Sequence, residues 1–233
     1  MYLPIFNPMY YLFALPALIL GLYAQYKVRS AYDRYMKVRN VNNLTGVEAA
    51  QRLLAAAALR NVPVQETPGT LSDHYDPRQK TLFLSTNVAR VPSVAALGIV
   101  AHEVGHAMQD ADGYVPLKLR GGLVPVVQIG SWLGPILFLV GMFLAMTPLS
   151  LVGLLLFAGT AVFSLVTLPV EYDASNRAIA LLASSGTIAN LEEEQSVRKV
   201  LNAAALTYVA AAAQSISTIL FYVFLLGGSR RKQ

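Results

Sequence analysis

Three long stretches of this 233-residue chain contain no Asp, Glu, Lys, Arg or His, and they constrain the fold more than any other feature. They are residues 1–26, 121–170 and 200–229. A helix needs about 20 mostly apolar residues to cross a bilayer. Each outer stretch therefore predicts one transmembrane helix. The middle stretch is long enough for a hairpin of two helices, divided by a turn at Thr147-Pro148.

The composition agrees with a membrane protein. Hydrophobic residues make up 55% of the chain and charged residues only 13%, whereas a soluble domain has about 25% charged residues. The chain has no cysteine, which excludes disulfides and thiolate metal ligands. We attribute the net charge of +5 to anchoring at the lipid bilayer and predict no nucleic-acid partner.

The distribution of charge predicts the orientation in the membrane. Four spans place residues 27–120 and 171–199 on one side, and this side carries every acidic residue, every histidine and 15 of the 18 Lys and Arg residues. The positive-inside rule makes it the cytoplasmic side. The basic tail at residues 230–233 conflicts with this orientation, but the residues that flank the first helix usually dominate.

These patterns predict a mainly α membrane protein with four transmembrane helices and a small α+β catalytic portion. The expected segments are transmembrane helix 1–26, catalytic region 27–120, transmembrane hairpin 121–170, third-ligand helical region 171–203, transmembrane helix 204–229 and basic tail 230–233.

A HEVGH string, from His102 to His106, contains two of the three histidines in the chain. On a helix, residues at i and i+4 share a face, so both imidazoles can bind one Zn²⁺ while Glu103 reaches the metal-bound water. The spacing predicts a helix from Pro92 or Ser93 to about residue 112. The preceding residues of this helix are almost all apolar, so two histidines and a glutamate buried there need partners, which a cation would supply.

Two further patterns describe the rest of the catalytic region. Apolar residues recur at helical spacing over residues 46–60, and Thr45 with Glu48 makes a capping box at the start. Residues 62–65 and 81–85 are typical of short strands, separated by turn residues. We expect the second strand to pair with an extended substrate.

A catalytic zinc takes three protein ligands, and no further histidine follows His106. Glu171, Asp173 and His74 are the candidates for the third position. Glu171 is favoured because the hairpin returns the chain there to the face that it left after the HEVGH helix. The simpler interpretations are a charge marking the end of a span for Glu171 and a turn histidine for His74.

The chemistry that this arrangement serves is peptide-bond hydrolysis. Zinc lowers the pKa of its water and polarises the scissile carbonyl, and Glu103 takes the proton and passes it to the leaving amine. The oxyanion needs a further donor. The sequence offers four candidates without choosing among them: His74, Tyr75, Tyr172 and Arg177.

Four segments together resemble the YugP-like neutral zinc metallopeptidases of bacterial membranes. They are DHYDPR at 73–78, SVAALGIVAHEVGHAMQ at 93–109, GYVPLKLR at 113–120 and LPVEYDAS at 168–175. A more distant similarity is to the HtpX heat-shock protease and the CAAX prenyl protease. The resemblance runs through nearly the whole chain and implies a gluzincin-like, zincin-type site: His102, His106 and Glu171 as zinc ligands, Glu103 as base, in a multi-pass protein of the bacterial inner membrane.

One position departs from that pattern. Many related proteases have an acidic residue four positions after the ligand glutamate, where it orients a ligand histidine. This chain has Ser175 there. We expect Asp110 or Asp173 to supply the missing support.

The function predicted from the sequence is a zinc-dependent endopeptidase that faces the cytoplasm and cleaves membrane-associated proteins or peptides. One alternative is a catalytically silent zinc-binding scaffold or adaptor, which would need the ligands but no base at Glu103. Another is a zinc hydrolase that acts on a lipid. The sequence does not indicate the oligomeric state.

Overall fold

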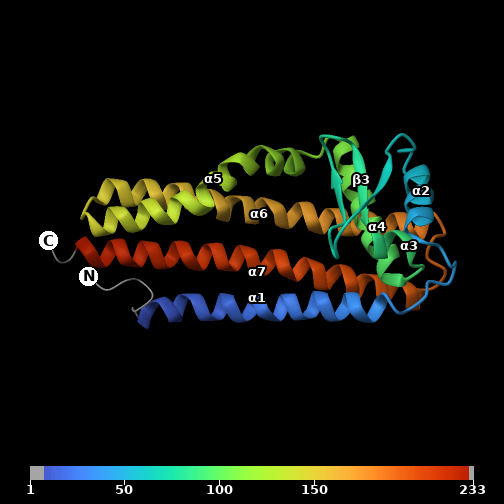
Figure 1. The fold of residues 1–233 in the computed structure, drawn as a ribbon, viewed down its shortest axis with the longest axis horizontal. Helices are drawn as coiled ribbons and strands as arrows, with labels where there is room; N and C mark the ends of the chain where they lie inside the picture. The colour runs from blue at the N-terminus through green and yellow to red at the C-terminus, as the bar shows by residue number, and fades with distance from the viewer. Residues whose placement is uncertain (1–7, 231–233) are drawn as a thin grey trace. The chain divides into compact units, whose positions relative to one another are not determined.

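Four long helices dominate the computed structural model, which describes residues 8–230 (Figure 1). All four are long and apolar enough to cross a membrane. They are α1 Pro8–Tyr35, α5 Val115–Phe143, α6 Thr147–Ser184 and α7 Leu191–Arg230. With the small sheet described below, they confirm the predicted fold class. The start of the first predicted span and residues 231–233 of the basic tail lie outside the described residues.

Helix α6 corrects one expectation about the third-ligand region. The sequence suggested that a span ends near Val170 and that a separate helix follows. Instead α6 continues unbroken from Thr147 to Ser184, with Pro169 inside it. The residues that follow Pro169 include Ala174 and Ala178, which favour helix. Glu171 therefore lies on a continuous helix and not at the start of a new one.

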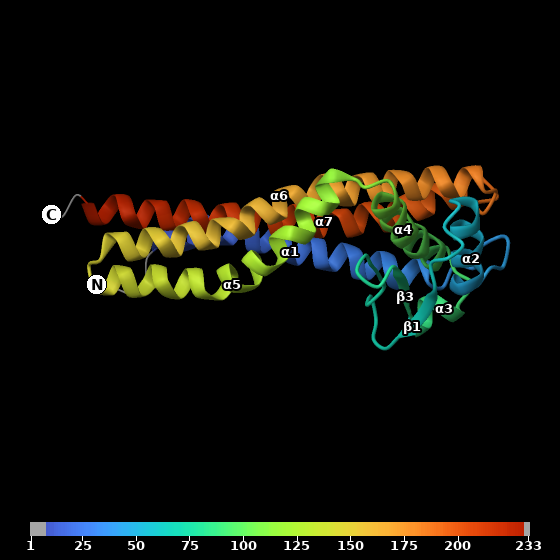
Figure 2. The ribbon, with the colours of Figure 1, turned by 90° about the horizontal axis from the view of Figure 1, so that it is seen from above.

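The chain divides into two compact units, which we call the apolar unit and the polar unit. The apolar unit comprises residues 1–25, 118–168 and 207–233, and the polar unit comprises residues 26–117 and 169–206. Small residues bring α5 and α6 together within the apolar unit: a Cβ atom on Gly153 would lie 2.6 Å from the carbonyl oxygen of Gly134. Figure 2 shows the same helices from above.

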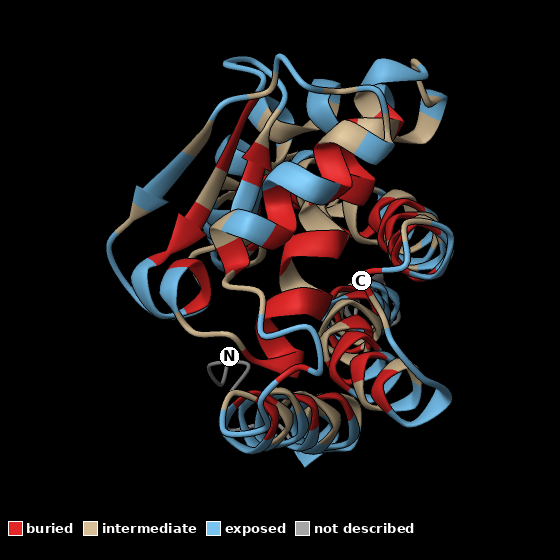
Figure 3. Cartoon of the chain, turned by 90° about the vertical axis from the view of Figure 1, so that its right-hand side faces the viewer, coloured by how far each residue is buried: buried red, intermediate tan, exposed pale blue. Residues whose placement is uncertain are grey.

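The polar unit contains a small sheet and three shorter helices. They are α2 Gly46–Ala56, β1 Val64–Thr67, β2 His74–Asp76, β3 Thr81–Ser85, α3 Thr86–Arg90 and α4 Val94–Ala111. The strand order is β1-β3-β2, with β3 parallel to β1 and antiparallel to β2. The core forms where α2, α4 and β3 meet, and Figure 3 shows the buried residues of the chain in red.

The sheet order overturns the expectation that residues 81–85 accept an extended substrate. Strand β3 is the central strand and is hydrogen-bonded on both sides, so it has no free edge. Strand β2 was missed because its three residues run into the turn-forming Asp76-Pro77 pair. It pairs with β3, with Tyr75 opposite Leu82, and this pairing cannot be predicted from the local sequence pattern.

Helix termini follow the local chemistry that the sequence predicts. Thr45 and Glu48 form the capping box of α2, which confirms that prediction. Helix α2 is shorter than expected because Ala58, just after its last turn, has a left-handed φ of 59°. Ser93 caps α4 by accepting a hydrogen bond from the backbone N–H of Ala96 (3.1 Å).

Candidate metal centre

The HEVGH string lies on α4, whose other residues are mostly buried apolar side chains. His102 and His106 are one helical turn apart, so their rings project from the same face. The ring centroids lie 4.7 Å apart and the planes meet at 84°. The helix thus presents two imidazole groups side by side.

Glu171 on α6 completes a group of three donors. Its Oε2 atom lies 3.0 Å from His102 Nε2 and 3.6 Å from His106 Nε2, and the side chain is 2% exposed. Ligand atoms from all three residues lie within 4.8 Å of one another. The ligands of a tetrahedral zinc, with bonds of about 2.0–2.2 Å, lie roughly 3.4 Å apart. Two imidazole nitrogens and one carboxylate oxygen at these distances fit a zinc ion that keeps a fourth position open.

Gly105 allows α4 and α6 to approach closely enough for this grouping. A Cβ atom at Gly105 would lie 2.5 Å from the backbone carbonyl oxygen of Ala174 on α6. Because the atom that this Cβ would meet belongs to the backbone, no change of side-chain rotamer can relieve the clash. Packing against α6 therefore requires glycine at position 105, next to His106.

Gly105→Ala is expected to lower the free energy of unfolding by about 2 kcal/mol or more, because the added methyl group forces α4 away from α6. Zinc binding should weaken in the same variant, since Glu171 moves away from the histidines. Thermal unfolding and zinc titration of the purified chain test both effects. Gly121→Ala, where an added Cβ meets nothing within 4 Å, is the control. Equal stability of the two variants would contradict this account of the packing.

Gln109, which the sequence analysis did not single out, orients His106. It is fully buried; its Nε2 donates to the carbonyl oxygen of Val170 and to Asp173 Oδ2, each at 2.8 Å. Both partners can only accept, so Oε1 must face His106 Nδ1, which lies 2.9 Å away. The proton therefore sits on Nδ1, and Nε2 is left to bind a cation. The available signal was the i+3 spacing from His106, which places Gln109 beside it.

Gln109→Leu should weaken zinc affinity by roughly 10–100-fold, the usual effect of removing a partner that orients a histidine ligand. The change keeps a side chain of similar size but removes the acceptor for His106 Nδ1. Competition with a chromogenic chelator measures the zinc affinity. Gln195→Leu, at an exposed position of α7, serves as the control and should leave the affinity unchanged. If both variants bind zinc like the wild type, Gln109 has no orienting role.

Ser175 lies four positions after Glu171, where the family resemblance implied an acidic residue, and its hydroxyl group reaches His102. Its Oγ is 3.2 Å from His102 Nδ1. Asp173 acts on His106 only through Gln109, and Asp110 accepts a hydrogen bond from the Tyr75 hydroxyl group (2.9 Å). The two histidines are thus oriented by neutral groups, a serine and a glutamine.

Glu103 lies on the same helix, next to the first histidine. Its Oε2 accepts a hydrogen bond from the backbone N–H of Tyr75 on β2 (2.9 Å). Desolvation by the surrounding protein raises the pKa of Glu103 above the usual carboxyl value, although His106 and His102 oppose this shift. A raised pKa brings the carboxylate closer to the range in which it accepts a proton at neutral pH.

The pKa of His106 is also raised, but here the neighbouring carboxylates outweigh the effect of burial. Burial alone would lower its pKa, but the hydrogen bond to Glu171 and the charge of Glu103 raise it above the usual value. Binding of a cation would therefore displace a proton, as is usual for histidine ligands.

The remaining predicted contact residues differ in their surroundings. His74 is exposed, and its ring stacks on Phe83 with centroids 4.8 Å apart. Tyr172 is 50% exposed. Arg177 is held by ion pairs with Asp173 and Asp112.

Comparison with known proteins adds two findings. The model of a family described as "Putative neutral zinc metallopeptidase" matches residues 10–227. A curated protein of Bacillus subtilis (strain 168), "Putative membrane protease YugP", is 44% identical over 214 residues, which cover 92% of this chain and 95% of that protein. No solved structure matches the chain.

Proposed function

This chain belongs to the family of neutral zinc metallopeptidases, and on that premise we propose that it is a membrane-integrated, zinc-dependent endopeptidase. The observation that carries the proposal is the meeting of His102, His106 and Glu171 from two helices. Glu103 lies beside them and is held by the backbone of Tyr75. The site thus combines three possible metal ligands with a neighbouring carboxylate that can act as a general base.

His102, His106 and Glu171 would hold the zinc ion. When bound, zinc supplies Lewis-acid chemistry, acidifying a water molecule and polarising the scissile carbonyl group. The buried position of Glu171 keeps its carboxylate directed at both histidines. Gln109 and Ser175 hold the two rings in the orientation that binding requires.

Glu103 takes the proton that the attacking water loses and later gives it to the leaving amine. The hydrogen bond from Tyr75 fixes one of its carboxylate oxygens, so the second oxygen can be aimed at the water. For the oxyanion, the hydroxyl group of Tyr75 and the guanidinium of Arg177 are both already bonded to carboxylates. His74 and Tyr172 remain our candidates for that role.

We propose that the site faces the cytoplasm at the inner membrane and acts on membrane-associated proteins or peptides. The support is the side of the membrane that carries 15 of the 18 basic residues and all the proposed site residues. A silent scaffold would need the three ligands alone. The oriented carboxylate of Glu103, which is not among the three clustered donors, favours an enzyme.

Product analysis tests the proposal against lipid hydrolysis. The full-length chain, loaded with zinc and reconstituted in phospholipid vesicles, is incubated with a mixture of peptides, and peptides and lipids are both examined by mass spectrometry. We expect new peptide termini and intact lipids, and we expect a zinc chelator to stop the cleavage. Release of fatty acids without peptide cleavage would contradict the proposed peptidase activity and show that the protein is a lipid hydrolase.

A further inference from the structure

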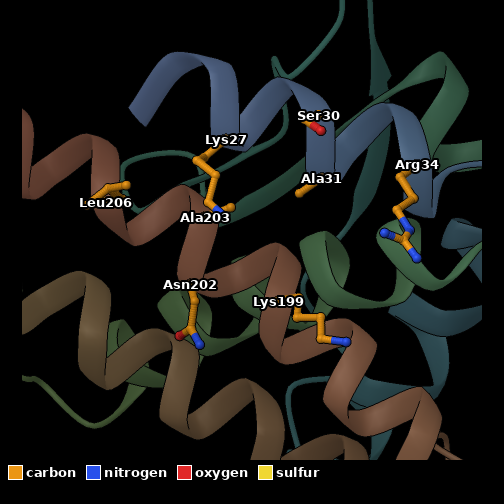
Figure 4. Close-up of a pocket in the computed structure, with 8 residues that line it drawn as sticks. All are labelled: Lys27, Ser30, Ala31, Arg34, Lys199, Asn202, Ala203 and Leu206. Carbon is orange, nitrogen blue, oxygen red and sulfur yellow. The ribbon is translucent and has the colours of Figure 1, made fainter. Parts of the chain in front are cut away.

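A pocket lies within the polar unit, between α1 and α7. Its volume is about 260 Å³. Four residues from each helix line it (Figure 4): Lys27, Ser30, Ala31, Arg34, Lys199, Asn202, Ala203 and Leu206. None of them belongs to the proposed zinc site.

The lining residues carry charge of one sign. Lys27, Arg34 and Lys199 are basic, and none of the eight is acidic. Ser30 and Asn202 add neutral groups that donate hydrogen bonds. The Arg34 guanidinium lies 5.6 Å from the ring centroid of Tyr35, a cation–π distance that restrains it. Such a lining favours an anion with several acceptor oxygens.

The sequence places this pocket where both helices leave the bilayer. Lys27 is the first charged residue after the charge-free stretch 1–26, and Lys199 is the last one before the charge-free stretch 200–229. Lysine at such positions extends its ammonium group toward the lipid headgroups. The pocket is therefore at the depth where phosphate groups of the bilayer are found.

The pocket also has a polarity gradient. Lys27 and Arg34 are seven residues apart on α1, as are Lys199 and Leu206 on α7, which corresponds to roughly 10 Å along each helix. The end toward the bilayer has Lys27 on α1 beside Ala203 and Leu206 on α7, and the opposite end has the two cations Arg34 and Lys199 and no apolar residue (Figure 4). A phospholipid has the same order, an anionic headgroup above an apolar chain.

We propose that this pocket binds the phosphate-containing headgroup of an anionic phospholipid in the leaflet next to the polar unit. Arg34 and Lys199 attract the phosphate at one end of the pocket and Lys27 contacts the lipid nearer the bilayer, Ser30 and Asn202 bond the headgroup oxygens, and the lipid chain passes Leu206 into the bilayer. Basic pockets between transmembrane helices are known sites for such headgroups. This site is independent of zinc and of peptide hydrolysis.

The test measures lipid-dependent thermal stability of the full-length chain in a neutral detergent. The probes are short-chain phosphatidylglycerol, short-chain phosphatidylcholine and inorganic phosphate. We expect a saturable rise in Tm with phosphatidylglycerol and a much smaller effect of the other two. If inorganic phosphate acts equally well, the lipid assignment is wrong and the site binds free anions.

Two variants connect the effect to the pocket. The triple change Lys27→Gln, Arg34→Gln and Lys199→Gln should weaken the apparent affinity for phosphatidylglycerol at least roughly tenfold. Asn202→Trp should weaken it too, because it fills the pocket and keeps all three cations. A control with the same loss of charge, Arg29→Gln, Lys37→Gln and Arg39→Gln, lies outside the lining and should bind like the wild type.

The controls also separate folding from binding. Zinc content of each variant reports whether the polar unit is intact, since the zinc site lies in the same unit. Equal losses of affinity in the two triple variants would show a general effect of charge and overturn the proposal. Unchanged affinity in the pocket variants would overturn it as well.

Discussion

Replacing Glu103 with Gln is expected to reduce peptide cleavage by roughly 100- to 10,000-fold, the contribution usually made by a positioned general base. The glutamine has nearly the same shape and can still accept the hydrogen bond from the Tyr75 N–H, but it cannot take a proton from water. Zinc should stay bound, because Glu103 is not among the three clustered donors. Initial rates of cleavage of a fluorogenic peptide, with zinc measured on the same sample, test both parts.

The matched control is Glu192→Gln, which removes one carboxylate at an exposed position in the first turn of α7. It should cleave peptides at the wild-type rate. If Glu103→Gln also keeps the wild-type rate, Glu103 is not the base and the enzyme interpretation fails. If Glu103→Gln loses its zinc, the residue supports the site in a way that our assignment omits.

Glu171→Ala is expected to have the largest effect on metal binding. It removes one of the three donors and leaves His102 and His106 as the remaining pair. Zinc affinity should fall by more than the roughly 10–100-fold that we expect for loss of an orienting group such as Gln109. Cleavage at limiting zinc should disappear with it. Equilibrium dialysis against buffered zinc measures the affinity.

Tyr172→Phe is the control for this experiment, because it changes the next residue of α6 and a side chain that is half exposed. Its zinc affinity should match that of the wild type. Circular dichroism of Glu171→Ala separates loss of a ligand from loss of the fold. If a folded Glu171→Ala variant keeps full zinc occupancy, Glu171 is not the third ligand and another residue must fill that position.

The elements that the sequence predicted well are those with a strong local signature. The charge-free stretches predicted the four long helices, the capping box of Thr45 and Glu48 predicted where α2 begins, and the start of α4 was expected at Pro92 or Ser93, next to its observed first residue Val94. The two histidines share a helix face because of their spacing alone. Each of these features depends on residues that are neighbours in the sequence.

The features that were missed depend on contacts between distant segments. The spacing alone places Gln109 beside His106, but the direction of its amide group is fixed only when α6 brings Val170 and Asp173 to it. The need for glycine at position 105 appears only when the carbonyl group of Ala174 lies beside it. Strand β2 is too short to be recognised without its partner β3. The prediction of Glu171 as the third ligand depended on the family resemblance and on the hairpin that returns the chain to the same side of the membrane, and on no local sequence pattern.

Titration of metal-free protein with zinc tests the central claim most directly. Peptide cleavage is followed as zinc is added to the full-length chain in vesicles, with bound zinc measured at each step. We predict that cleavage rises in proportion to bound zinc and reaches its maximum at about one zinc ion per chain, as expected for a single three-ligand site. Cleavage that is already complete without zinc, or that stays absent when one zinc ion is bound, would contradict the account.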